Sequence, residues 1–217
     1  KIKNISANIN DIMNFAEILF NNNGEIKKFI INNLALENLE IEKLILTREN
    51  ETNILIEIDS SNLDLRKFFK NKFWSNEDDF WLLSNKNIKF IINSDNIILE
   101  NGISLNGIIE ASYNNKKLSG KVEGNLETLN QSINKIKLDI FQNMKEIVLK
   151  GNGYLLDEKI DINVISLNGS IKEIKVNSNN AGKVLNALNI SELIFGGNLE
   201  AKIDLSNQHL NEINYDI

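Results

Sequence analysis

Few residues of this chain have types and surroundings suited to catalysis or metal binding. The single histidine, His209, stands in the polar run NQHLN and has no neighbours that would complete a Ser-His-Asp triad. The acidic run Glu77–Asp79 precedes Phe80 and Trp81, and carboxylates at that place fit the first turn of a helix better than a cation site. The sequence contains no cysteine, which excludes thiolate catalysis and cysteine zinc sites. We therefore expect a protein that is not an enzyme and that requires no metal and no cofactor.

Phosphate-binding features are also missing. Gly196-Gly197 lies between a helical pattern and a strand pattern, whereas a phosphate-binding loop follows a strand and opens a helix. The net charge is −6 and the sequence pI is about 5.0. Nucleic-acid binding needs a concentrated basic surface. We therefore expect no nucleotide site and no nucleic-acid partner.

What remains is a regular alternation of apolar and polar side chains, which is typical of strands with one buried and one wet face. Ile54, Ile56 and Ile58, for example, would share a face opposite Glu57 and Asp59. The same pattern recurs along most of the chain. Its clearest further examples are Gly102–Tyr113, Lys117–Leu126, Lys135–Phe141 and Leu199–Leu205.

Turns and glycines suggest how these strands connect. Asn114-Asn115 and Asp157-Glu158 separate alternating segments and have the composition of hairpin turns. Glycine within a strand pattern marks a bulge or a bend, so the sheet should curve. Glycines of this kind are Gly107, Gly120, Gly124, Gly151 and Gly153.

Three short stretches have the spacing of amphipathic helices. They are Asn10–Phe20, Asn62–Phe73 with Asn62 as its N-cap, and a third that begins after Asn179 or Asn180 and ends near Asn189 in a left-handed conformation. No proline- or glycine-rich linker divides the chain. The predicted fold is therefore mainly β: residues 1–217 form one long curved antiparallel sheet, a groove or taco-like meander, with about three short helices.

The third helical stretch and its surroundings, SNNAGKVLNALNISELIFGGNLEAKID, resemble a recurring segment of the AsmA-like superfamily, particularly its YhdP-like and TamB-related intermembrane lipid-transport branches. In that segment an Ala-Gly pair and a leucine stripe precede a Gly-Gly pair and an alternating strand. Asn189 replaces a usual glycine, and Phe195 stands where the family often has a basic residue. The matching residues are Ala181, Gly182, Leu185, Ala187, Leu188, Gly196, Gly197 and Leu199.

The resemblance implies a section of a longer periplasmic protein that conducts phospholipid between the inner and outer membranes of a diderm bacterium. Its partners would be phospholipid acyl chains, the same polypeptide continuing at both ends, and membranes reached through regions outside this sequence, including an inner-membrane anchor. The apolar stripes would line the groove. The lining residues in this hypothesis are Ile54, Ile56, Ile58, Ile103, Leu105, Ile109, Leu118, Val122, Ile136, Leu138, Ile140, Leu199 and Ile203.

Two other functions fit the same patterns. One is a scaffold or interaction module that supports outer-membrane assembly by pairing a partner strand at its edge. The other is an extracellular, repetitive β-domain of adhesin type, which should have a fully packed interior and regular repeats. An apolar trough that remains accessible favours the groove, whereas a closed core favours the adhesin-like domain.

Overall fold

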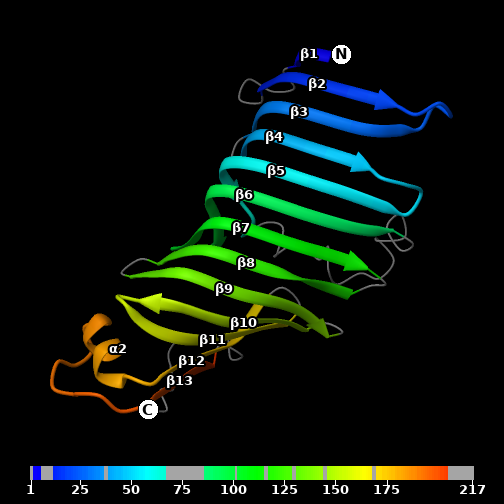
Figure 1. The fold of residues 1–217 in the computed structure, drawn as a ribbon. Helices are drawn as coiled ribbons and strands as arrows, with labels where there is room; N and C mark the ends of the chain where they lie inside the picture. Colours follow the sequence, from blue (N-terminus) through cyan, green and yellow to red (C-terminus); the bar gives the residue numbers. More distant parts are fainter. Residues whose placement is uncertain are drawn as a thin grey trace.

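The structure, a computed structural model, describes residues 2–5, 12–36, 39–66, 86–100, 102–114, 117–128, 131–143, 146–167 and 170–204. These residues form one open, curved, thirteen-stranded sheet whose strands follow one another in sequence order (Figure 1). The prediction of a mainly β, curved sheet is therefore confirmed. The strands are β1 (Ile2–Ile5), β2 (Ile12–Phe20), β3 (Ile26–Leu36), β4 (Leu39–Arg48), β5 (Asn53–Asp64), β6 (Asn87–Glu100), β7 (Ile103–Asn114), β8 (Lys117–Thr128), β9 (Ser132–Asn143), β10 (Glu146–Leu155), β11 (Glu158–Leu167), β12 (Ser170–Ser178) and β13 (Leu199–Asp204).

One junction in this sheet departs from the predicted antiparallel meander. β5 and β6 pair in parallel, with Ile54 opposite Ile88 and Ile58 opposite Ile92, whereas the other neighbouring strands pair antiparallel. Parallel strands need a connection of a dozen residues or more, because the chain must return to the same end of the sheet. The long segment between Asp64 and Asn87 meets that requirement.

The curvature of the sheet coincides with a line of backbone irregularities that crosses β3 to β10. Asn33 and Lys135 have left-handed φ angles of 53° and 52°, and Gly124 has a φ of 154°. Register shifts occur beside them, at Ser94/Ile97 in β6 and at Asn152/Tyr154 in β10. The cross-strand pairs Ser60–Ser94, Ser94–Gly107 and Gly107–Gly124 connect these positions from strand to strand.

We call this line the bend line. A bulge bends its strand and increases the local twist, so bulges in register fold the whole sheet. In Figure 1 the middle strands turn sharply near one end, consistent with this arrangement. The prediction that Gly124 and Gly153 mark bulges or bends is confirmed, since both stand at register shifts.

The third predicted helix is present as α2 (Ala181–Ala187). The side chain of Asn180 accepts a hydrogen bond from the amide of Lys183 at 3.2 Å, which makes Asn180 the N-cap. Asn189 has a φ of 56°, so the predicted left-handed residue after the helix is also confirmed. Ala181, Val184 and Leu185 are buried on the side of α2 that faces the sheet.

The first predicted helix is corrected by the structure, and the second is corrected only at its N-terminal end. Residues 12–20 of the stretch Asn10–Phe20 form strand β2, in which Ala16 pairs with Ile31 and is 2% exposed. Asn62 lies within β5 rather than at a helix N-cap, and Leu65 follows that strand. A short stretch rich in apolar residues fits both helical and strand periods, and pairing with neighbouring strands decides between them.

Several other predictions lie outside the described residues. These are the remainder of the second helix with Phe68, Phe69 and Phe73, the run Glu77–Asp79 with Phe80 and Trp81, and His209.

Replacing Asn180 with alanine tests the cap of α2. The change should lower the free energy of unfolding by about 1 kcal/mol, because the amide of Lys183 loses its acceptor. Asn186→Ala, within the same helix, is the control and should leave stability unchanged or slightly higher, since alanine is the better helix former. Urea denaturation of the two variants measures the difference. Equal midpoints would show that the Asn180 side chain does not stabilise α2.

Candidate functional site: one apolar face of the sheet

The candidate site is a face of the sheet, and strand register defines it. Residues that pair directly across two strands lie on the same face. One row of such pairs runs through every strand from β2 to β13 without meeting a polar residue. This central row consists of Ala16, Ile31, Leu44, Ile58, Ile92, Ile109, Val122, Leu138, Gly151, Ile162, Val176 and Ala201.

The neighbouring row, on the opposite face, is mostly apolar in β3 to β6, where it reads Ile30, Ile45, Glu57 and Ile91, and has the reverse character from β7 onward. From β7 it reads Glu110, Lys121, Asp139, Lys150, Asn163, Lys175 and Lys202. We call the two sides the apolar face and the polar face. Because a one-residue slip would exchange them, the contrast favours a single register from β7 to β13.

All thirteen residues predicted to line a groove lie on the apolar face. Ile54, Ile56 and Ile58 join it through the parallel pairing with β6, and Ile103 and Ile109 through the pairing of β7 with β8. The structure therefore brings together the residues that the alternation singled out. Five of them are buried, namely Leu105, Val122, Ile136, Ile140 and Leu199, and eight are half-buried, namely Ile54, Ile56, Ile58, Ile103, Ile109, Leu118, Leu138 and Ile203.

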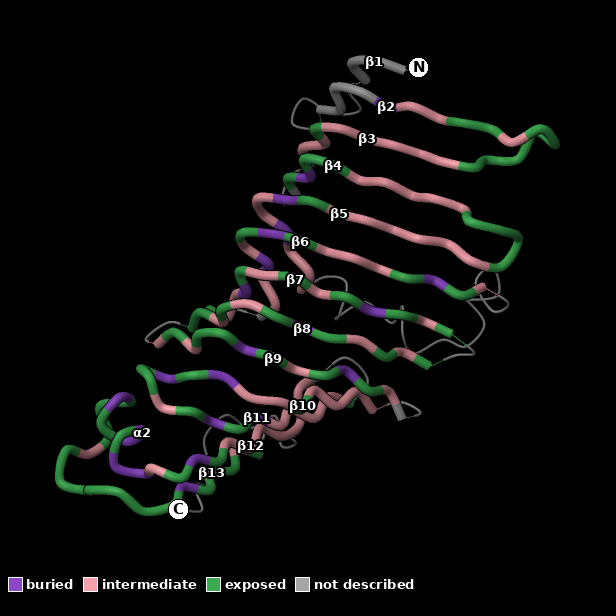
Figure 2. Tube along the Cα trace, in the orientation of Figure 1, coloured by how far each residue is buried: buried purple, intermediate pink, exposed green. Residues whose placement is uncertain are grey.

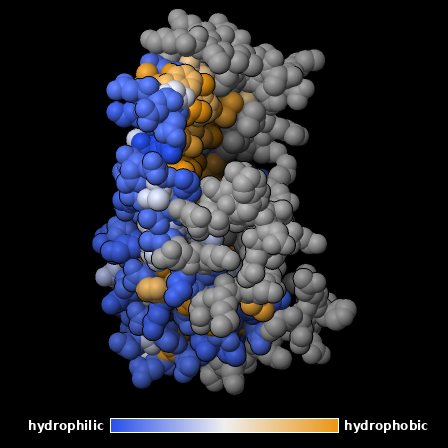
Figure 3. All heavy atoms as spheres, turned by 90° about the vertical axis from the view of Figure 1, so that its right-hand side faces the viewer, coloured by the Kyte–Doolittle hydropathy of each residue, from blue (hydrophilic) through white to orange (hydrophobic). Residues whose placement is uncertain are grey.

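Burial along the central row is uneven (Figure 2): Ala16, Val122 and Ile162 are buried, and its other members are half-buried. In β3 to β7 the central-row residues Ile31, Leu44, Ile58, Ile92 and Ile109 remain half-buried. Figure 3 shows hydrophobic side chains gathered in a hollow beside a hydrophilic wall, most clearly near the N-terminal strands. This part of the apolar face is therefore still partly accessible.

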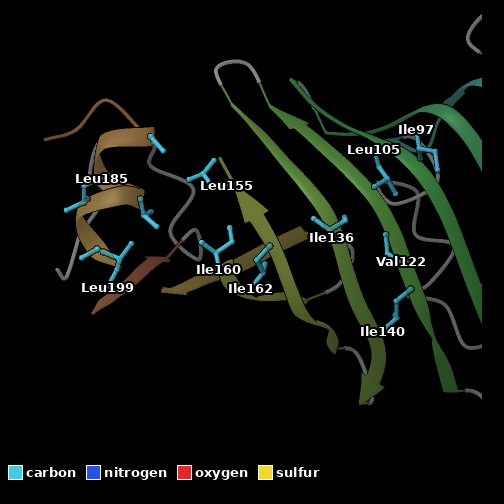
Figure 4. Close-up of a cluster of buried hydrophobic side chains, with 13 residues drawn as sticks. Ile97, Leu105, Val122, Ile136, Ile140, Leu155, Ile160, Ile162, Leu185 and Leu199 are labelled. Carbon is cyan, nitrogen blue, oxygen red and sulfur yellow. The ribbon is translucent and has the colours of Figure 1, made fainter. Parts of the chain in front are cut away.

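At the C-terminal end α2 lies on the apolar face. Val184 and Leu185, exposed by 1% and 4%, belong to one cluster of contacts with Ile160, Ile162 and Leu199 (Figure 4). The cluster extends along the sheet as far as β6. Contact with α2 buries these side chains, and the apolar surface removed from water stabilises this end by about 25 cal/mol per Å².

Two polar contacts fix the position of α2 on the sheet. Gln131, just before β9, donates its Nε2 hydrogen to the carbonyl oxygen of Ala187 at 2.7 Å. The Nζ of Lys183 lies 3.3 Å from the Oε2 of Glu158 at the start of β11. The helix is thus held against the edge formed by the β8–β9 and β10–β11 turns.

The residues matched to the AsmA-like segment have structural roles here. Gly182 is buried, and a Cβ at this position would collide with the carbonyl oxygen of Ile194. Its amide donates to the carbonyl oxygen of Gly196 at 3.1 Å, and the amide of Ala181 donates to that of Gly197 at 2.7 Å. Gly196 and Gly197 have φ angles of 72° and 83° and turn the chain back toward β13. Leu188, in contrast, is 40% exposed.

Electrostatics also distinguish the two faces. On the polar face Glu173 contacts Lys202 at 2.9 Å and Lys175 at 3.0 Å. The hydrogen bonds from Lys202 and then Lys175 lower the pKa of Glu173, and the bond with Glu173 raises the pKa of Lys202. On the apolar face, burial raises the pKa of the Tyr113 hydroxyl, because a phenolate would be poorly solvated there.

A polar depression lies along the bend line and is lined by Asn32, Asn33, Glu42, Lys43, Asp59, Ser60, Asn93, Ser94 and Asp95. Its two buried hydroxyls are already engaged, Ser60 with the carbonyl oxygen of Glu40 and Ser94 with the amide of Asn96. Within the described ranges, no group of three or more His, Cys, Asp or Glu residues is placed to hold a metal ion. The depression is explained by the bulges that form it.

Sequence reasoning missed the N-terminal half of the apolar face, including Phe29, Ile31, Leu44, Leu46, Phe90 and Ile92. The neighbouring residues Ile30 and Ile45 are also apolar, so the period-two signal in these strands is blurred. The sequence contained only an indirect signal for these apolar residues. The apolar face of β5, with Ile54, Ile56 and Ile58, requires apolar partners on the strands at either side, and strands adjacent in sequence usually pair.

No protein-family model matches this chain, and no curated protein and no solved structure is significantly similar to it. The fold therefore defines the class of molecule: an open, curved and almost wholly antiparallel sheet with one apolar and one polar face. None of the helices in the described ranges is long and apolar enough to cross a membrane.

Proposed function

We propose that this chain is a section of a periplasmic groove protein in which the apolar face conducts phospholipid between the inner and outer membranes. The observation that carries the proposal is the central row, which offers apolar side chains from β2 to β13 and stays partly accessible over β3 to β7. The resemblance of residues 178–204 to AsmA-like proteins supports it. An inner-membrane anchor would belong to regions outside this sequence.

The hydrophobic effect would drive lipid binding in such a groove. Each methylene group that leaves water for an apolar surface gains about 0.8 kcal/mol, so a single acyl chain supplies enough free energy for binding without any specific contact. The headgroup stays in water at the open side of the sheet. Thirteen strands spaced by about 4.8 Å extend about 60 Å, which exceeds the 40–45 Å of a bilayer with its headgroups.

Photocrosslinking tests the proposal. A photoreactive amino acid at Ile109, on the apolar face, should crosslink to radiolabelled phospholipid, whereas one at the adjacent Ile108, on the polar face, should not. The two positions share a strand and differ only in face. Absence of a lipid adduct at Ile109, Ile58 and Ile92 in folded protein would end the groove hypothesis.

A scaffold that recruits a partner strand is the second candidate function. It is favoured by the open ends of the sheet, because β1 and β13 each pair with one neighbouring strand among those described. Unpaired edges are templates for strand addition. The same edges would allow the groove to continue into the rest of a longer chain, so a partner strand and a lipid are compatible.

A further inference from the structure

Residues 190–195, between α2 and β13, carry the most exposed large apolar side chains in the described ranges. Leu193 is 87% exposed, Phe195 90% and Ile190 60%, and Ile194 is 45% exposed. We call this segment the apolar loop. Single exposed apolar residues are ordinary, but several within six residues form a patch that needs an explanation.

The backbone holds these side chains outward. At the start of the loop the amide of Ile190 donates to the carbonyl oxygen of Leu185 at 2.8 Å. At its end Gly196 and Gly197 accept from the first two amides of α2. In between, the amide of Leu193 donates to the Oγ of Ser191 at 3.3 Å. Exposure of Leu193 and Phe195 is therefore part of the folded geometry.

A second exposed leucine lies at the same edge of the sheet. Leu156 is 64% exposed in the β10–β11 turn, and the Lys183–Glu158 ion pair ties that turn to α2 (Figure 1). Leu156 has a φ of 48° and Asp157 a φ of 54°, a two-residue turn in which asparagine and glycine are favoured. A leucine in the left-handed region carries strain, which points to a role for its side chain at the surface.

Charge and area indicate what this surface contacts. Glu192 is the one charged residue between residues 188 and 198, and the nearby Lys183 is paired with Glu158, so nothing here would attract an anionic surface. Four loop side chains offer on the order of 400 Å² of apolar area, against about 800 Å² per partner in a stable protein interface. A bilayer needs no matching pocket, because its lipids rearrange around a protruding side chain.

We propose that the apolar loop and Leu156 insert into the interface of a zwitterionic phospholipid bilayer. This edge of the sheet would then lie against a membrane, with Leu193 and Phe195 as the leading side chains. The inference goes beyond the proposed function, since the loop contacts a bilayer whether or not the apolar face conducts lipid. Labels on the loop and labels on the apolar face therefore report the two proposals separately.

The absence of cysteine makes a direct test available, because one introduced cysteine is the sole labelling position. An environment-sensitive nitrobenzoxadiazole dye at Phe195→Cys should brighten and shift to the blue on addition of phosphatidylcholine vesicles. The same dye at Phe141→Cys is the control, since Phe141 is 53% exposed on the polar face, opposite Ser119. No response at position 195, or an equal response at position 141, would overturn the proposal.

Vesicle flotation of unlabelled protein gives the magnitude. The double change Leu193→Ser and Phe195→Ser should lower the vesicle partition coefficient by about a hundredfold, a factor of about ten for each side chain. Leu156→Asn should weaken vesicle binding while raising the urea midpoint, since asparagine relieves the strain of the turn. If the patch were instead an interface between two copies, the serine variant would abolish self-association and vesicle binding would be absent from the start, which would refute the proposal.

Discussion

Replacing Gly151 with alanine should destabilise the sheet by about 2–3 kcal/mol, a large effect for the addition of one methyl group. Gly151 lies in the central row on β10, opposite Leu138 on β9. A Cβ at Gly151 would collide with the backbone carbonyl of Lys137 and would stand 2.9 Å from the Cα of Leu138. Because those obstacles are backbone atoms, the strands themselves must move apart.

Gly24→Ala is the matched control for that variant. Gly24 has a φ of 79° in the β2–β3 turn, and a Cβ there would meet no atom within 4 Å. Its cost should be about 1 kcal/mol, from the left-handed conformation alone. Urea denaturation followed by circular dichroism measures both variants, and a Gly151→Ala midpoint no lower than that of Gly24→Ala would show that β9 and β10 have room to separate.

A carboxylate on the apolar face should weaken binding of phospholipid. We expect Ile109→Asp to weaken binding of a fluorescent phospholipid by more than about tenfold. An acyl chain gains little free energy of transfer beside a charged group, and it loses the apolar contact that the isoleucine side chain provides. Ile109 is half-buried in the central row, next to Val122. Titration of the labelled lipid into folded protein provides the measurement.

The adjacent residue supplies the control. Ile108 is 43% exposed on the polar face, opposite Glu123. Ile108→Asp should leave lipid binding unchanged while adding the same charge to the same strand. Equal loss of binding in both variants would indicate a general effect on stability, and equal retention would mean that the apolar face is not the binding surface.

The faces of the sheet were predictable from sequence where polar residues alternate strictly with apolar ones. Strand β8 is an example, with Leu118, Val122 and Leu126 on one face. The polar residues Ser119, Lys121 and Glu123 between them can only belong to the other face. The helix α2 was predictable for a similar reason: an asparagine cap, an apolar stripe and Asn189 all agree on the same boundaries. Consistency between local signals made these predictions reliable.

The predictions that failed did so where local signals were ambiguous. The stretch Asn10–Phe20 has apolar residues at both helical and strand spacings. Only its pairing with the neighbouring strands β1 and β3 favours a strand over a helix. The turn predicted at Asp157-Glu158 lies one residue earlier, at Leu156-Asp157, because the pairing of Leu155 with Glu158 outweighs the strain of a left-handed leucine. The parallel junction of β5 and β6 depends on a long connection, which no periodicity reports.

The order of the strands has a consequence for how the chain folds. Most contacts in the sheet join strands that are neighbours in sequence, so each hairpin can form locally and the sheet can grow by addition of one hairpin to the next. The pairing of β5 with β6 is different, since the chain between Asp64 and Asn87 must first return to the same end of the sheet. We expect this junction to separate two units that fold at different rates. Hydrogen exchange during refolding should protect amides within β2–β5 and β7–β12 before those that join β5 to β6.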